Sequence, residues 1–269
     1  MTTIDLTKYE SITAEAPAGR VSDKYRFIPT TDAIQAFEDK NWKVSAVSET
    51  RAKTDHRRGY QRHMVRFRHR GQNVTGKTQL EVGGVVPEIV LINAHDGTAS
   101  FRIMAGLFRL ICSNGLVVAD SVFSTMKIKH LEYSAKDIHE AIEYVGDTIP
   151  RIMGRILEFQ QIPLTEQDQR AYADEALALR HGRDAVLEGR VLADPLLTPI
   201  RREESGNSLW ETYNRVQEKI LKGGKYQSNN RNPGNPIKTR GVQSIKEEIN
   251  VNQGLWYLAE EMASIKTAA

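Results

Sequence analysis

Residues 88–104 read EIVLINAHDGTASFRIM, and this stretch decides the fold. It opens with the largely β-branched run IVLI at 89–92, which favours a strand buried in a sheet. The segment HDGT at 95–98 has the residue types of a tight turn, and residues 100–104 are expected to form the returning strand. The stretch therefore predicts two antiparallel strands joined by a turn, the first of them over residues 88–93.

The segments around this hairpin predict more strands and one helix. A helix is expected over residues 32–41, followed by strands over 43–51 and 62–70. Residues 71–86 are rich in Gly and polar side chains, and they predict a mobile loop. Residues 1–22 are small and polar, so we expect a loose N-terminal arm there.

The chain changes character after about residue 133, where apolar residues recur at every third or fourth position. Pro150 should kink the first helix of this half or begin a second one. Thr165 and Asp168 have the spacing of a capping box, and Gly182 is expected to end the helix that they open. Two more helices are predicted, over residues 207–221 and 242–265.

These elements define an α+β fold, with an N-terminal helix and antiparallel β-meander followed by a helical C-terminal half. We expect the arm 1–22, a sheet domain over 23–133 and a helical region over 134–269. Residues 223–240 contain Gly, Asn, Pro and basic residues but few apolar ones, so they predict a flexible basic loop inside the helical region.

Positive charge is concentrated in two segments. Residues 51–70 carry eight Lys and Arg against one acid, and residues 219–246 carry seven against none. The net charge of the whole chain is only +3, so the remainder is acidic. Segregated charge of this kind creates a local positive potential that attracts polyanions, and it makes nucleic acid the first partner to test.

The strand predicted over residues 62–70 is the sharpest of these features. Alternation places Arg66, Arg68 and Arg70 on one face, with Val65 and Phe67 on the other. Three arginines in a row can bind phosphate oxygens, because the planar guanidinium donates in pairs. The alternative is a solvated sheet face whose arginines pair with acids of a neighbouring strand.

The second segment, residues 219–246, can order on a polyanion, or it can be a plain solvated linker. It lacks the spacing of a phosphate-binding GxxxxGK[ST] loop, so nucleotide binding is rejected there. An exposed Tyr226 could stack on a base. The residues that we expect to contact nucleic acid are Arg51, Lys53, Arg57, Arg58, Arg62, Arg66, Arg68, Arg70, Lys222, Lys225, Tyr226, Arg231, Lys238 and Arg240.

The sequence predicts no catalytic residue, metal site or cofactor. The seven histidines form no HExxH motif, and His95 beside Asp96 is explained by turn chemistry. The one cysteine, Cys112, cannot form an intrachain disulfide, which fits a reducing cytoplasm. No apolar run approaches the roughly 20 residues of a membrane span, and the N-terminus lacks the features of a secretory signal.

Several stretches resemble, in order, the family of uncharacterised phage/plasmid-like proteins, which prophages and conjugative plasmids carry. The resemblance runs from about residue 23 to the C-terminus and implies a mobile-element context, but no catalytic residues. At the level of the fold alone, the pattern is also similar to phage single-strand annealing proteins. The motifs cover residues 25–30, 62–68, 87–98, 106–118, 209–218 and 255–260.

Three functions follow as hypotheses. The first is a non-enzymatic DNA-binding protein that prefers single strands, promotes annealing and forms homo-oligomers. The second is a mobile-element antagonist of a host defence system that acts by binding a host protein. The third is a nuclease or other hydrolase, which would need a carboxylate cluster assembled near the arginines by the fold.

Overall fold

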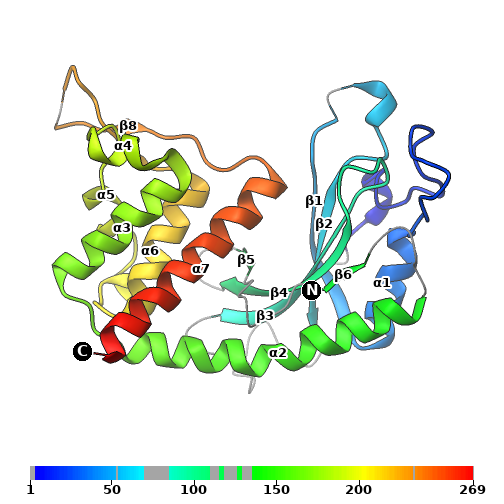
Figure 1. Cartoon of the computed structure of the whole chain (residues 1–269), viewed down its shortest axis with the longest axis horizontal. Coiled ribbons are helices and arrows are strands. Elements are labelled where there is room, and N and C mark those ends of the chain that lie inside the picture. Colours follow the sequence, from blue (N-terminus) through cyan, green and yellow to red (C-terminus); the bar gives the residue numbers. More distant parts are fainter. Residues whose placement is uncertain are drawn as a thin grey trace. The chain divides into compact units, whose positions relative to one another are not determined.

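The structure is a computed structural model that describes residues 4–268, except Lys53, 70–84, 110–114, 118–125, 129–134 and Pro233. The chain divides into two compact units, Met1–Ile152 and Met153–Ala269. Our expected boundary at residue 134 coincides with the start of the first long helix, whereas the division between the units falls inside that helix. The predicted α+β class is confirmed (Figure 1).

The first unit is built on an antiparallel six-stranded sheet in the order β1-β2-β3-β4-β5, with β6 also paired to β4. The predicted hairpin is present, because β3 pairs with β4 from Val85↔Arg109 to Ile92↔Arg102. The loop predicted over residues 71–86 falls mostly outside the described residues, and its last two residues belong to β3. The strands are β1 Trp42–Glu49, β2 His63–His69, β3 Val85–Asn93, β4 Phe101–Arg109, β5 Gly115–Val117 and β6 Met126–Ile128.

Helix α1, Thr30–Asp39, packs its apolar side on one face of the sheet. The rings of Phe37 and Phe67 stack with centroids 3.9 Å apart, and both side chains are fully buried. Phe67 lies on β2 with Val65 on the same face, as the alternation of the sequence predicts. The core of the first unit therefore begins between α1 and this face.

The N-terminal segment is packed, so our expectation of a loose arm does not describe residues 4–22. It contains a short 3-10 helix, η1 (Leu6–Lys8), and Ser11 and Ile12 are fully buried. The Ser11 amide donates to the Glu49 carboxylate over 2.9 Å, and the Ala18 amide donates to the carbonyl of His95 over 2.9 Å. A second 3-10 helix, η2 (Asp55–Arg57), lies between β1 and β2.

Helix α2, Ala135–Gln161, continues through Pro150, so this proline does not begin a new helix. In the second unit, α3 (Glu166–His181) opens with the predicted capping box of Thr165 and Asp168, and Gly182 caps its end. The predicted helices over 207–221 and 242–265 are also present. The remaining elements of this unit are α4 Arg183–Leu187, α5 Asp194–Leu197, η3 Arg202–Glu204, α6 Leu209–Lys222, β7 Lys225–Gln227, β8 Ile237–Lys238 and α7 Ile245–Ala268.

The core of the second unit lies among α3, α6 and α7. Tyr172 of α3 donates its hydroxyl to the carbonyl of Leu255 on α7 over 2.9 Å. Tyr213 of α6 meets Trp256 of α7 edge to face, with ring centroids 6.0 Å apart. All four side chains are fully buried, so these contacts fix the three helices against one another.

Candidate nucleic-acid interface

The basic loop predicted over residues 223–240 contains a short hairpin that is anchored to the second unit, and its flexibility stays a prediction. Strands β7 and β8 pair antiparallel, and Gln227 also bridges to Val191. The amide of Leu192 donates to the carbonyl of Tyr226 over 2.8 Å. Segments outside the hairpin thus supply hydrogen-bond partners for its backbone, and the composition of residues 223–240 alone does not predict these partners.

Tyr226 is the anchor of this hairpin, and our expectation that it stacks on a base is wrong for this structure. Its side chain is fully buried, and its ring meets that of His181 edge to face at 5.7 Å. Its neighbours on β7, Lys225 and Gln227, are exposed, because side chains alternate along a strand. One large aromatic residue in an otherwise polar stretch was the sequence signal for an anchor.

Two glycines close the base of the hairpin. Gly223 has φ of 79°, and a Cβ there would lie 2.3 Å from the carbonyl oxygen of Thr239. A Cβ on Gly241 would lie 2.7 Å from the carbonyl oxygen of Lys222. The two chain segments therefore approach too closely for any larger residue, and the base has one fixed geometry.

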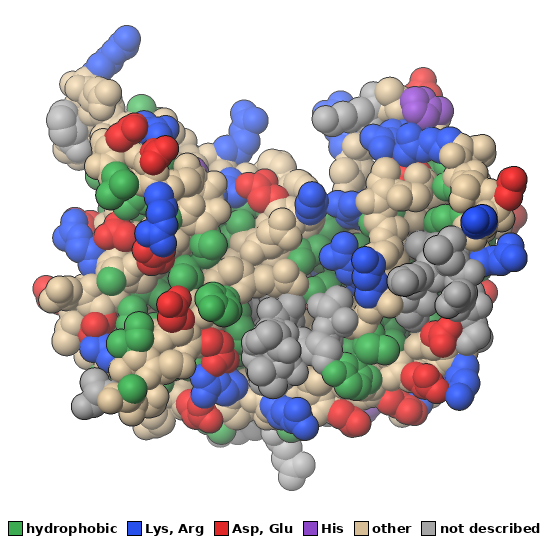
Figure 2. Space-filling model, in the orientation of Figure 1, with side chains coloured by type: hydrophobic (Ala, Val, Ile, Leu, Met, Phe, Trp, Pro, Cys, Tyr) green, Lys and Arg blue, Asp and Glu red, His purple; other side chains and the backbone are tan. Residues whose placement is uncertain are grey.

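Four basic side chains of the hairpin point into solvent. Within the described residues, none of them has a carboxylate at ion-pairing distance. Lys225 lies directly opposite Lys238 in the strand register. A basic side chain also projects from the tip of the hairpin, at the upper left of the space-filling view (Figure 2). We call this set the basic hairpin; it consists of Lys225, Arg231, Lys238 and Arg240.

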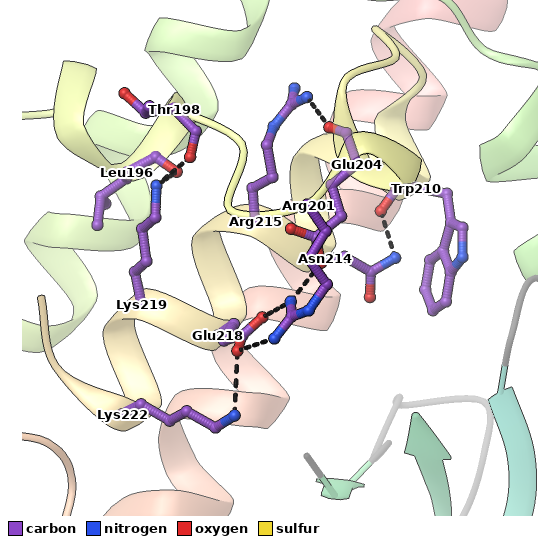
Figure 3. Close-up of polar contacts among 10 residues, drawn as sticks. All are labelled: Leu196, Thr198, Arg201, Glu204, Trp210, Asn214, Arg215, Glu218, Lys219 and Lys222. Atoms are coloured by element: carbon purple, nitrogen blue, oxygen red, sulfur yellow. Dashed lines mark hydrogen bonds and ion pairs between the residues drawn. The ribbon is translucent and has the colours of Figure 1, made fainter. Parts of the chain in front are cut away.

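The two lysines of α6 that precede the hairpin, Lys219 and Lys222, bind polar groups of the protein itself (Figure 3). Lys219 donates to the backbone carbonyls of Leu196, over 3.2 Å, and of Thr198, both drawn in Figure 3. It also donates to the carbonyl of Pro195 over 2.6 Å. Burial lowers the pKa of Lys219 to about 8. Its ammonium group thus caps the end of α5 and is not free to bind a polyanion.

Lys222, a predicted contact residue, is exposed but shares a carboxylate. Its ammonium lies 3.0 Å from Glu218, which also accepts two bonds from Arg201 (Figure 3). Burial alone would raise the pKa of Glu218, but the bonds from Arg201 and Lys222 lower it to about 2. Glu218 therefore stays ionised and neutralises much of the charge of Lys222.

The arginine face of β2 is buried, which corrects our expectation that it is open to solvent. Arg66 and Arg68 both bind Glu88 of β3, at 3.2 Å and 2.7 Å, and Ser45 donates to the same carboxylate over 3.0 Å. Only 7% of the Arg66 side chain and none of that of Glu88 is exposed. Two-sided burial of the sheet is the physical reason, since Val90 on this face is also fully buried.

Three arginines of the loop before β2 have partners in the protein, and two of these partners are carboxylates. Arg57 lies 3.5 Å from Asp96, and Arg58 lies 3.4 Å from Glu10. Arg62 donates to the carbonyl of Thr98 over 2.7 Å. Arg51 is exposed and, within the described residues, has no ion-pair partner. The two remaining predicted contact residues, Lys53 and Arg70, lie outside the described residues, as does Cys112.

A buried polar cluster at the end of β2 and β3 escaped the sequence analysis. The His63 ring nitrogen Nδ1 lies 3.1 Å from the carbonyl of Gln61, so Nδ1 carries the proton. Nε2 must then accept the 2.8 Å bond from the Thr30 hydroxyl, while Thr30 itself accepts from Asn93 over 3.1 Å.

The predicted turn after β3 is confirmed, because Asp96 accepts from the amide of Thr98 over 3.0 Å.

This cluster predicts a loss of stability in acid. Burial, and then the nearby His95, lower the pKa of His63 to about 3, against about 6.5 in the unfolded chain. Stability is therefore complete above about pH 6.5 and should fall below it by up to about 1.4 kcal/mol per pH unit, because only the unfolded state takes up the proton. Urea unfolding between neutral pH and about pH 5 checks this slope. His63→Gln is the control; a slope that is equally steep in this variant would contradict the assignment.

Two general findings complete the description. Among the described residues, no group of three or more His, Cys, Asp or Glu side chains is placed to hold a metal ion. In the same part of the chain, no helix combines the length and the apolar character that crossing a bilayer requires.

The chain is therefore an α+β protein. One of its units is built on an antiparallel sheet, and the other is helical and carries the exposed basic hairpin. The family model described as "Domain of unknown function (DUF932)" matches residues 17–256, so the chain belongs to the DUF932 family. Two UPF0380 proteins of Escherichia coli (strain K12), YfjQ and YafZ, are each 33% identical to it over 241 residues. These matches cover 90% of this chain and 83% of each relative. No solved structure matches.

Proposed function

We propose that this DUF932 chain is a non-enzymatic DNA-binding protein of a phage or plasmid, which holds single strands through its basic hairpin. One observation carries the proposal: four exposed cations sit on an anchored hairpin with no carboxylate among residues 219–246. Charge of one sign that no local acid neutralises attracts a polyanion and releases its counterions.

The shape of the hairpin favours a single strand over a duplex. A hairpin of two short strands is narrow, and a flexible strand can bend so that successive phosphates reach its cations. Duplex DNA is stiff over about 150 base pairs and offers its phosphates only at fixed positions. Neutralised phosphates also repel a second strand less, so we expect the bound strand to anneal faster with its complement.

Fluorescence anisotropy of a labelled single-stranded oligonucleotide at rising salt tests this function. If the four hairpin cations neutralise three or four phosphates, log K should fall against log salt with a slope of about −2 to −3. An unlabelled duplex at equal phosphate concentration should compete less well than an unlabelled single strand. No binding at low salt would end the proposal.

The alternative function, antagonism of a host defence system, makes a different prediction. A host protein should then remain bound to the chain after nuclease treatment of the lysate, and its binding should not depend on nucleic acid. DNA binding is preferred because the basic hairpin offers repeated charge and not an apolar contact surface.

A further inference from the structure

We propose that Lys225 and Lys238 together form a binding site for a single backbone phosphate. The inference rests on the proposed function and assigns the centre of the interface. In the antiparallel ladder of β7 and β8, these two lysines are Cα partners, the register shifts only after them, between Lys225 and Gln227, and both side chains are exposed. Side chains directly opposite each other lie with Cβ atoms about 4.5–5.5 Å apart, so both ammonium groups can reach one anion.

The pair is unfavourable without a ligand. Like charges directly opposite in a sheet destabilise it, and a hairpin gains more from an opposite-charge or β-branched pair at this position. Among the described residues, no carboxylate lies within ion-pairing distance of either lysine. A phosphodiester with its delocalised negative charge removes the repulsion and binds both donors at once.

The surrounding structure holds the pair in place. Tyr226, next to Lys225, is fully buried, and the amide of Thr239, next to Lys238, donates to the carbonyl of Gly224 over 2.8 Å. A ligand therefore meets two lysines whose backbone is already ordered, and little entropy is lost when it binds.

Arg240 extends the site along the strand. It follows Lys238 by two residues, a separation of about 6.6 Å in an extended chain. Its carbonyl accepts from Arg180 over 3.0 Å, and Arg180 in turn pairs with Glu247 at 2.6 Å, so the backbone here is fixed. This separation is close to that of neighbouring phosphates in an extended strand, and Arg240 is placed for the phosphate next to the one at the lysine pair.

Lys225→Glu tests the site, because it should weaken binding of the oligonucleotide without lowering the thermal stability of the chain. The introduced carboxylate neutralises Lys238, so the one phosphate held by the pair is lost, and affinity for a single-stranded oligonucleotide at ~0.1 M salt should fall about 5-fold. The salt slope should become less steep by about 0.7. Thermal stability should be unchanged or higher, since an opposite-charge pair replaces a like-charge pair.

Lys136→Glu is the matched control, with the same change in net charge on an exposed lysine of α2. It should leave affinity and slope near those of the unaltered chain. Inorganic phosphate at constant ionic strength separates the two possible sources of the anion: it should compete weakly, because it offers no adjoining phosphate to Arg240.

Three results would overturn the site. The first is an unchanged affinity and slope in Lys225→Glu. The second is a lower melting temperature together with weaker binding, which would show that the lysines serve the folding of the hairpin. The third is competition by free phosphate as strong, per phosphate, as that of the oligonucleotide. If the unaltered chain binds no oligonucleotide, the proposed function fails as well; if it binds and Lys225→Glu binds equally, only the phosphate site fails.

Discussion

Glu88→Gln should lower the free energy of unfolding by up to about 3–5 kcal/mol, because it leaves two buried arginines without their shared carboxylate. Glu88 is fully buried, and Arg66 and Arg68 lie within 3.2 Å and 2.7 Å of it. A glutamine has nearly the same shape, so the change removes charge and not volume. Urea unfolding followed by circular dichroism measures the effect.

Glu175→Gln is the matched control for this change. Glu175 pairs with Arg183 at 3.0 Å, but both side chains are substantially exposed, and water screens such a pair. Its unfolding midpoint should stay close to that of the unaltered chain. If Glu88→Gln were as stable as this control and bound DNA more tightly, the arginines of β2, freed from their carboxylate, would be contact residues after all.

Neutralising the whole basic hairpin should have the largest effect on binding. Changing Lys225, Arg231, Lys238 and Arg240 to glutamine removes three or four phosphate contacts, and at ~0.1 M salt this should weaken single-strand binding by about 10²–10³-fold. The melting temperature should hardly change, because all four side chains are exposed and Tyr226 still anchors the hairpin.

A charge-matched control distinguishes the loss of the hairpin cations from a change in the net charge of the chain. Four exposed cations elsewhere in the chain, each paired with a carboxylate, can be changed to glutamine in the same way. This second variant should bind within a few-fold of the unaltered chain, since its cations are already neutralised; equal losses in the two variants would show that binding follows net charge alone. The four residues are Lys8, Lys136, Arg170 and Arg183.

The elements that the sequence predicts well are those set by local chemistry. The hairpin of β3 and β4 follows from a β-branched run and an Asp-Gly turn, and α3 begins at the capping box of Thr165 and Asp168. In both cases, residues a few positions apart decide the outcome, so no knowledge of distant contacts is needed.

The contact residues were harder to predict because their exposure depends on distant partners. Alternation correctly separated Arg66 and Arg68 from Phe67, yet their burial depends on Glu88, which the strand register brings alongside from another strand. A single glutamate inside the apolar run of β3 was the one signal of this pairing. Arginines on a strand beside such a glutamate are better interpreted as its ion-pair partners than as a phosphate-binding surface.

The short hairpin inside the basic loop was not predicted from the sequence. Its composition is typical of a flexible segment, but Tyr226 and the close approach of Gly223 to Thr239 give it a fixed base. The four cations of this segment are exposed, as contact with nucleic acid requires, but their scaffold was not predicted. A preformed hairpin loses less entropy on binding than a loop that must order on its ligand.

The salt dependence of single-strand binding, compared between the unaltered chain and the variant with all four hairpin cations changed to glutamine, tests the central claim most directly. We expect a slope of about −2 to −3 for the unaltered chain and a slope near zero for the variant. Two parallel lines of equal slope would contradict it, because the phosphates would then be bound elsewhere on the molecule.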